Sequence, residues 1–452
     1  MTDATHIANL TEFLAFRATD LRYENIPEPA RALVRQCVLD YFGVAIAGAD
    51  DALVRILLDE MMEAGGAPQA GLIGHQVRLP ALSAALVNGA AAHALDYDDV
   101  NMAMPGHPSV ALLPALLALA ELRGASGRDL IIAFVAGYET ACRIGAALRP
   151  GHYNLGFHST ATIGSFGAAA ACARLLGLQT IGTATALGIA GTQAAGLKSQ
   201  FGTMCKPFHA GKAAQNGMLA ARLAARGFSS RTDILECVQG FASTHGPDFS
   251  PEAALTTPEA GLHLFANLFK YHAACYLTHA PIECARRLRE EHRLNPDDIA
   301  RITLRLDESC ERVCNIPAPA DGLQSKFSLR QTVAMALAGV DTASLGAYSA
   351  ENVQDPALVS LREGIRIEWQ DSWPQTLAEL EVELTDGRRA TAKHDAGMPA
   401  ANIDEQGERL AAKFDVLVEP ALGAPRTREL REMISGLDGL ADVGSLGRLA
   451  AA

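Results

Sequence analysis

Segments rich in small residues, spread between about Leu10 and Leu262, constrain the fold of this chain most strongly. Many carry alanine and glycine on more than one helical face, and glycine or proline separates them: residues 110–122, 129–148, 160–176 and 211–225. Aromatic residues make up only 6% of the chain, which suits closely packed helices better than a β-sandwich. We therefore expect a helical region whose inner helices cross near a central cavity.

The pattern changes after about residue 268, where apolar and polar residues begin to alternate. Ile302, Leu304 and Leu306 recur with a period of two, which indicates a half-buried strand. A second such run, residues 380–384, leads through an Asp-Gly pair into residues 390–393 and predicts a β-hairpin.

A chain of 452 residues is too long for one ordinary domain, and the patterns divide it into three stretches. The predicted fold is mainly α, with a large all-helical domain formed by both chain ends, residues 1–268 and 400–452. A smaller α+β domain, residues 269–399, is inserted between them. Helical spacing returns from Asp404 to about Leu437, and we expect the Gly/Ala/Leu-rich stretch after Gly436 to fray.

The charge balance limits the choice of partners. Acidic residues outnumber basic ones 51 to 38, which gives a formal net charge of −13 and disfavours a nucleic-acid partner. Because this charge would also repel an anionic substrate, a carboxylate ligand must meet local cationic groups inside a pocket. Buried Lys, Arg and His residues are therefore the first candidates for function.

Cysteine spacing and the N-terminal residues bear on the cellular compartment of the protein. The nine cysteines form no CxxC pair, which is typical of reduced cytosolic thiols. Residues Met1–His6 have neither the basic nor the apolar region of a signal peptide, and no later apolar run is expected to span a bilayer. We expect a cytoplasmic protein without a membrane partner.

Several common catalytic signatures are absent. Residues 209–213 lack the upstream glycine and the Ser/Thr of a phosphate loop, and Gly188, Gly191 and Gly196 are misspaced for a dinucleotide fingerprint. No Gly-x-Ser-x-Gly elbow occurs. His93–Asp99 could hold a divalent metal, but no Cys or His partner has customary ligand spacing, so we expect no metal.

Polar clusters interrupt the apolar helical sequence at four places, where buried charges require a reason. They are residues 96–99 with 106–109, residues 152–160, residues 202–212 and residues 270–279. The last lies at the expected domain junction, a favoured position for clefts.

Each cluster also has a purely structural interpretation. The Asp run could cap a helix terminus and His107 could be a turn residue. Ser159 or Thr160 could be only an N-cap, although His158 would then stand beside a helix dipole that favours a neutral base. Lys206 could be solvated, or it could reach into a cavity and pair with a substrate carboxylate.

In their residues and their order along the chain, these clusters resemble the motifs of the MmgE/PrpD family. That family includes 2-methylcitrate dehydratase, cis-aconitate decarboxylase and iminodisuccinate epimerase. The resemblance rests on residues 93–99, 106–109, 156–160, 202–211 and 278–279. It implies a homodimer, no bound cofactor, and the two-domain arrangement described above. By position in the motifs, it implies active-site roles for Asp96, His107, His158, Lys206 and His279.

Two positions depart from the family pattern. Val100 stands where decarboxylase-like members carry threonine, and Gln331 follows residues 327–330 where many members carry tyrosine. Both changes remove a hydroxyl from the expected pocket, which disfavours decarboxylation and leaves the substrate open.

The chemistry that the resemblance implies starts with loss of a proton alpha to a carboxylate, which requires stabilisation of an enolate-like dianion. We hypothesise that Lys206 and His107 hold substrate carboxylates, with His209 and Gln331 as further substrate-binding residues. His158 would act as general base or acid and Asp96 would orient an imidazole. His279 would be the opposing acid.

The expected activity is a lyase of dehydratase type acting on a small di- or tricarboxylic acid. The alternative is an epimerase of an iminodisuccinate-like dicarboxylate, in which the carbanion is reprotonated on the opposite face. A third interpretation is a non-catalytic carboxylate-binding protein, which the retention of all five ionisable positions disfavours.

Overall fold

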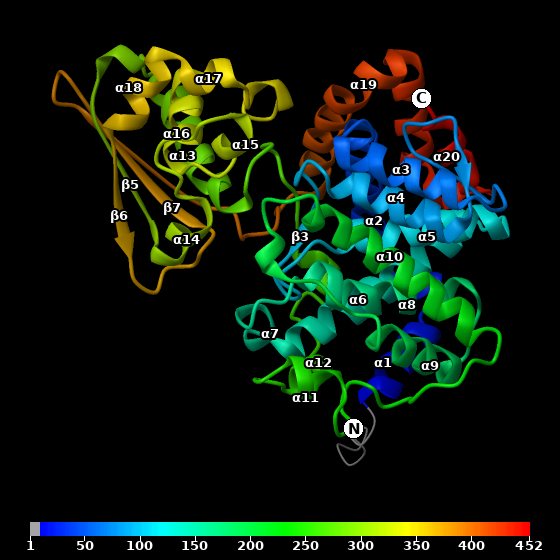
Figure 1. Ribbon diagram of the computed structural model, residues 1–452. Helices are drawn as coiled ribbons and strands as arrows, with labels where there is room; N and C mark the ends of the chain where they lie inside the picture. Colours follow the sequence, from blue (N-terminus) through cyan, green and yellow to red (C-terminus); the bar gives the residue numbers. More distant parts are fainter. Residues whose placement is uncertain (1–9) are drawn as a thin grey trace. The chain divides into compact units, whose positions relative to one another are not determined.

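The computed structural model describes residues 10–452, and these separate into two compact units (Figure 1). Of the described residues, unit 1 comprises 10–269 with Ala400–Ala452, and unit 2 comprises Lys270–Pro399. The expectation for Met1–His6 falls outside the described residues. Helices dominate the described chain, so the prediction of a mainly α protein is confirmed.

Unit 1 is built from helices of both chain ends. Its first part contains α1 (Leu10–Asp20), α2 (Glu28–Gly48), α3 (Ala52–Ala64), α4 (Ala81–His93), α5 (Pro108–Arg123), α6 (Gly127–Leu148), α7 (Gly151–Asn154), α8 (Ser159–Leu175), α9 (Thr180–Gly191), α10 (Cys205–Ala224), α11 (Phe241–His245) and α12 (Pro251–Leu255). Its second part contains α19 (Ile403–Ser435) and α20 (Gly444–Leu449). Helix α8 is the centre of the packing and contacts α5, α6, α9 and α10.

Glycines allow these central helices to approach closely. A Cβ atom added to Gly211 on α10 would lie 2.1 Å from the carbonyl oxygen of Leu86 on α4. A Cβ atom added to Gly217 would lie 2.4 Å from the Ala168 side chain on α8. The small residues of the sequence therefore serve helix contact in the core, as their pattern predicts.

Helix α6 corrects the expectation that no apolar run reaches the span of a bilayer. With 22 residues and a mean hydropathy of 1.4 in its most apolar window, it is long and apolar enough to cross a membrane. However, 83% of that window is buried inside the protein, where α6 packs against α8, α5 and α12. Its apolar character is therefore explained by its place in the core of unit 1.

The sequence predicted an all-helical large domain. Four short strands in unit 1 show that this prediction was wrong in detail. Strand β1 (Ala70–Gly71) pairs with β2 (Arg78–Leu79), and β3 (Val100–Asn101) pairs with β4 (Asn267–Leu268). Strands of two residues are too short to produce a visible alternation. The second pair fixes the end of the loop that follows α4, because Val100 faces Leu268 in the antiparallel register.

Unit 2 contains a four-stranded sheet in the order β6-β5-β7-β8. Strand β5 (Ile299–Asp307) is parallel to β6 (Ile365–Gln370) and antiparallel to β7 (Leu377–Leu384), which forms a hairpin with β8 (Arg389–Asp395). The predicted strand and the predicted hairpin are confirmed. Leu304, Ile367 and Leu380 lie side by side across three strands.

Unit 2 also contains six helices. They are α13 (His279–His292), α14 (Glu311–Cys314), α15 (Gly322–Ser325), α16 (Leu329–Ala338), α17 (Ala350–Gln354) and α18 (Pro356–Gly364). Helix α13 packs on β7, β8 and α16, and the buried side of β7 joins the apolar core that these elements share. On the other side Arg305 pairs with Glu368, Glu379 and Glu381, as expected of a solvated sheet face.

The C-terminal part of unit 1 differs from expectation at its end. Helix α19 packs against α2 and bends at Gly423, which has a non-helical φ of 74°. Gly423 lies between Pro420 and Pro425 in the sequence, and prolines commonly cause such bends. The stretch after Gly436 was expected to fray, yet it contains α20, and the Ala450 carbonyl accepts a hydrogen bond of 2.9 Å from Gly74. Leu446 of α20 is fully buried. The local sequence gives no sign of this burial, because it depends on packing against residues distant in the chain.

Candidate active site

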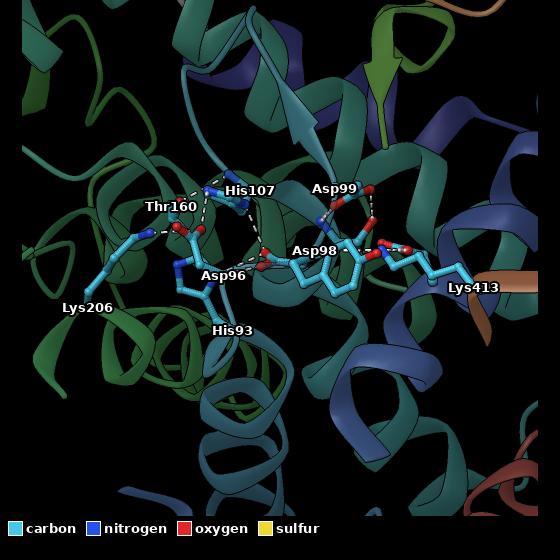
Figure 2. Close-up of polar contacts among 11 residues, drawn as sticks. His93, Asp96, Asp98, Asp99, His107, Thr160, Lys206 and Lys413 are labelled. Carbon is cyan, nitrogen blue, oxygen red and sulfur yellow. Dashed lines mark hydrogen bonds and ion pairs between the residues drawn. The ribbon is translucent and has the colours of Figure 1, made fainter. Parts of the chain in front are cut away.

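The loop between α4 and α5 contains two of the predicted site residues, Asp96 and His107, and Lys206 reaches it from α10 (Figure 2). His93 is the last residue of α4, and His107 is the N-cap of α5, with Pro108 in the first helical position. Asp96 has a φ of 52°, a left-handed conformation that is uncommon outside glycine and asparagine or aspartate. That conformation directs the loop so that its carboxylates reach separate partners.

Asp96, Lys206 and His107 meet at the partly exposed end of this cluster. Lys206, in the first turn of α10, places Nζ 2.8 Å from Asp96 Oδ1, and His107 Nε2 lies 3.8 Å from the same oxygen. Their side chains are 14%, 20% and 12% exposed in the order Lys206, Asp96 and His107, so a ligand can reach them. The prediction placed Lys206 in a loop before a helix, whereas α10 already begins at Cys205.

Asp98 lies behind these residues and contacts two imidazoles. His93 Nδ1 is 2.9 and 3.0 Å from the two Asp98 oxygens, and His107 Nδ1 is 2.9 Å from Oδ2, although its N–H is not aligned for a hydrogen bond. Burial alone would raise the pKa of Asp98, but the two imidazoles hold it well below its ordinary value. Burial lowers the pKa of His93 to about 4, so that imidazole is neutral near pH 7.

The neighbouring carboxylate, Asp99, faces away from the imidazoles. It accepts hydrogen bonds from Ser109 Oγ at 2.5 Å and from the Ser109 backbone N–H at 3.3 Å. Burial and the nearby Asp40 raise the pKa of Asp99 to about 7. Asp99 is therefore not the cap residue that the structural interpretation of the Asp run expected: the N-cap of α5 is His107, and Asp99 binds Ser109 in the first turn of that helix.

A lysine of α19, in the C-terminal part of unit 1, supports the same loop. Lys413 on α19 donates to Asp40 Oδ1 at 2.6 Å and to the Tyr97 carbonyl oxygen at 2.7 Å, and its Nζ lies 3.9 Å from the centroid of the Tyr97 ring. Lys413 is 8% exposed and Asp40 is 4% exposed. Figure 2 shows Lys206 and Lys413 reaching the loop from different sides.

His158 and His209 form the third part of the unit 1 cluster. His158, rather than Ser159 or Thr160, is the N-cap of α8, and its Nδ1 lies 3.0 Å from Nδ1 of His209 on α10. Burial, with a further effect of His93 and Lys206, holds the pKa of His158 well below its usual value. Its ring centroid is 5.9 Å from that of His93. His158 is therefore a neutral imidazole next to the Lys206 pair.

His279 belongs to unit 2, where it begins α13 as predicted. Burial, followed by nearby His272 and Lys270, holds its pKa well below the usual value. His272 lies within hydrogen-bond distance of Thr342 and Glu283, at 2.8 and 3.2 Å, and its ring centroid is 5.0 Å from that of His279. Among the described residues, His279 Nε2 has no hydrogen-bond partner.

Gln331, the other predicted residue of unit 2, is fully buried on α16. Its Nε2 donates to the Asn352 carbonyl at 3.0 Å and its Oε1 accepts from Arg362 at 2.7 Å. Both ends of the amide are therefore engaged within unit 2. The assignment of Gln331 to substrate binding stays a prediction, and these contacts give it no support.

Four ligand atoms of the unit 1 cluster would suit a metal by spacing alone. Atoms of His93, Asp96, Asp98 and His107 lie within 4.8 Å of one another. The same atoms are accounted for by contacts with the Lys206 ammonium and by the contacts of Asp98 with both imidazoles. A cation at this place would have to displace Lys206 from Asp96.

Sequence reasoning missed His93, Asp98 and Lys413 as members of this cluster. The first two stand inside the quoted motif, so their residue types at buried positions were the available signal. Lys413 lies 316 residues after Tyr97, and nothing in its local sequence marks it.

The chain matches known proteins over nearly its whole length. The MmgE/PrpD N-terminal domain matches residues 12–254 and the MmgE/PrpD C-terminal domain matches residues 272–438. Cis-aconitate decarboxylase of Aspergillus terreus is 27% identical, over 98% of this chain and 96% of the relative. A cis-aconitate decarboxylase-like protein of Aspergillus oryzae, oryM, is 31% identical over 68% of each chain, and cis-aconitate decarboxylase of Mus musculus is 27% identical over 98% and 93%.

These comparisons support an enzyme of lyase type that acts on a carboxylic acid. Together with the His, Asp and Lys residues that the motifs bring to one loop, they establish that this chain belongs to the MmgE/PrpD family.

Proposed function

We propose that this protein is a cofactor-independent lyase of dehydratase type, which removes a proton alpha to a carboxylate of a small di- or tricarboxylic acid. The observation that carries the proposal is that Lys206 and His107 both contact Asp96 beside a neutral, buried His158. A cation and a base in one place are what the formation of an enolate-like dianion requires.

Lys206 and His107 are the proposed carboxylate-binding groups. In a chain with a net charge of −13, a polycarboxylate needs a local cation, and Lys206 is the ammonium whose partner, Asp96, is itself reachable by a ligand. A substrate carboxylate that binds Lys206 would share it with Asp96. Asp96 then keeps the ammonium in place and faces Nε2 of His107.

His158 is the proposed general base. When its Nδ1 donates to Nδ1 of His209, the lone pair of Nε2 is available for the substrate proton. Burial and neighbouring cations depress its pKa, and a bound polycarboxylate would offset those cations and raise its basicity. The substrate itself therefore helps to activate the base.

The proposed reaction then needs a proton for the leaving hydroxyl. The base takes the alpha proton, the electron pair forms the alkene, and the β-hydroxyl leaves as water when an acid protonates it. His279 is the proposed donor of this proton. Burial and nearby cations depress its pKa, so His279 can donate this proton only as an imidazolium, which a bound polycarboxylate favours by offsetting those cations.

Decarboxylation is the second candidate, because the relatives named above are cis-aconitate decarboxylases. Against it stand Val100, a buried residue of β3 that brings no hydroxyl, and Gln331, whose amide is engaged elsewhere. Dehydration is therefore favoured. We also propose that the enzyme is a cytoplasmic homodimer.

The test is an NMR assay of the chelator-treated protein in deuterated water with citrate, 2-methylcitrate, cis- and trans-aconitate and iminodisuccinate stereoisomers. Loss of water from a hydroxy acid supports the proposal, and carbon dioxide release supports the second candidate instead. Deuterium incorporation with inversion and no alkene would identify an epimerase. Activity that disappears on chelation and returns with a metal would contradict a cofactor-free enzyme.

A further inference from the structure

We propose that Asp98 and His93 form a buried positioning pair that orients His107 for the reaction. This inference rests on the proposed function for its kinetic part, because His107 is there a carboxylate-binding residue. Its structural part, the orientation of two imidazoles by one carboxylate, can be measured without any substrate.

Asp98 is buried between two imidazoles. Its carboxylate contacts Nδ1 of both His93 and His107 at 2.9 Å, and it is 1% exposed. A substrate cannot reach so buried a group, so Asp98 can act only through the rings that it holds. An ionised carboxylate accepts hydrogen bonds and cannot donate them, which makes Nδ1 the donor on His93. Nδ1 of His107 faces the same carboxylate as a close polar contact at 2.9 Å that is not aligned for a hydrogen bond. The Nε2 atom of His107 is consequently the one presented to Asp96 and to a ligand.

His93 contacts both Asp98 and the ring of His107. Its side chain is fully buried, and it uses Nδ1 to donate to both Asp98 oxygens, while Nε2 has no hydrogen-bond partner among residues 10–452. A buried polar atom without a partner is costly and needs a reason. The centroid of the His93 ring lies 4.6 Å from that of His107. His93 therefore supports His107 in two ways, by direct ring packing and through the Asp98 carboxylate that both rings contact.

Asp99, the adjacent residue, has a buried carboxyl with different contacts. Asp99 contacts Ser109 on α5 and faces no imidazole. The two residues share a loop, a burial class and a side chain, and they differ in what they contact. Carboxylates that orient a functional imidazole commonly change activity about 10- to 100-fold when they are replaced, whereas a structural carboxyl does not affect the reaction step.

The experiment compares Asp98→Asn with the control Asp99→Asn. The amide of Asp98→Asn can accept from one Nδ1–H, but its NH₂ group then faces the other ring. We expect kcat to fall about 100-fold with KM within about threefold in Asp98→Asn, and to change less than about threefold in Asp99→Asn. Equal losses in both variants, or a native kcat in Asp98→Asn, would overturn the proposal.

A second pair tests His93 and covers the case in which Asp98→Asn does not fold. The amide of His93→Asn can still donate to Asp98 near the position of Nδ1, while His93→Leu fills the space without a donor. We expect His93→Asn to keep most of the native kcat and His93→Leu to lose about 10-fold or more. Equal activity of the two variants would contradict the role of the Nδ1 hydrogen bond.

The substrate-free measurement uses protein labelled with ¹⁵N-histidine and two-bond ¹H–¹⁵N correlations, with His93→Asn and His107→Asn for assignment. The native enzyme should show His93 as the Nδ1–H tautomer, and Asp98→Asn should change the tautomer of His93 or His107. Unchanged tautomers in that variant would refute the positioning role. If no acid in the panel is turned over by the native enzyme, the proposed function fails while this spectrum still decides the inference.

Discussion

Replacement of Lys413 by methionine tests whether α19 supports the candidate active-site loop. The change keeps most of the side-chain volume but removes an ammonium that lies 2.6 Å from Asp40 Oδ1 and 2.7 Å from the Tyr97 carbonyl oxygen. Because the two charged side chains are only 5% and 2% exposed, the loss leaves a buried carboxylate without this cation. Breaking such a buried pair costs about 3–5 kcal/mol of unfolding free energy.

The assay is urea unfolding followed by two signals. Trp369 and Trp373 are the only tryptophans of the chain and lie in unit 2, so their fluorescence reports that unit. Far-UV circular dichroism reports mainly the helices, most of which belong to unit 1. We expect the loss in Lys413→Met to appear in the circular dichroism transition.

Two further variants make this prediction quantitative. The double variant with Asp40→Asn should recover at least about 1.5 kcal/mol relative to the sum of the single losses, because it removes both charges. Arg431→Met is the matched control on the same helix: Arg431 contacts Asp415 at 2.7 Å, but these side chains are 32% and 31% exposed. Its expected loss is below about 1 kcal/mol. A loss below that value in Lys413→Met, with additive effects in the double variant, would refute the reasoning.

Three other predictions concern the site and the core. Lys206→Ala should lower kcat/KM about 10²- to 10³-fold, because the cation that faces Asp96 and the substrate is lost, and unchanged turnover in the NMR assay would rule out its assigned role. Gly211→Ala should lower the free energy of unfolding by about 2 kcal/mol or more, because its Cβ would lie 2.1 Å from the Leu86 oxygen. Gly182→Ala is the control, because its Cβ would lie 3.4 Å from the nearest atom, a side-chain carbon; it should be neutral or stabilising in the same urea titration. The pKa of Asp99, about 7, is raised above the ordinary carboxyl value, so the stability linked to its protonated form is present at low pH and lost as pH rises. The Tm of Asp99→Asn minus that of the native protein should therefore increase from about pH 5 to about pH 8, and a constant difference would contradict the raised pKa.

Local sequence was sufficient where a structure depends on neighbours along the chain. The periodicity of small and apolar residues located α5, α6 and α8, and alternation located β5 and the β7–β8 hairpin. It did not locate the start of α10, because Lys206 and His209 in its first turns resemble loop residues. It also missed β6, which is parallel to β5 and follows a connection of several helices.

The sequence by itself determined the helical character of the chain, strand β5 and the β7–β8 hairpin, the family and the residue types available for acid-base chemistry. Periodicity and motif order carry this information because each depends on residues close together in the chain. Only the tertiary structure decided that Asp98 contacts two imidazoles, that Lys413 supports Tyr97 from α19, and that the amide of Gln331 is engaged by Arg362. Partner choice and burial depend on contacts between distant segments, and a side chain's pKa follows from both.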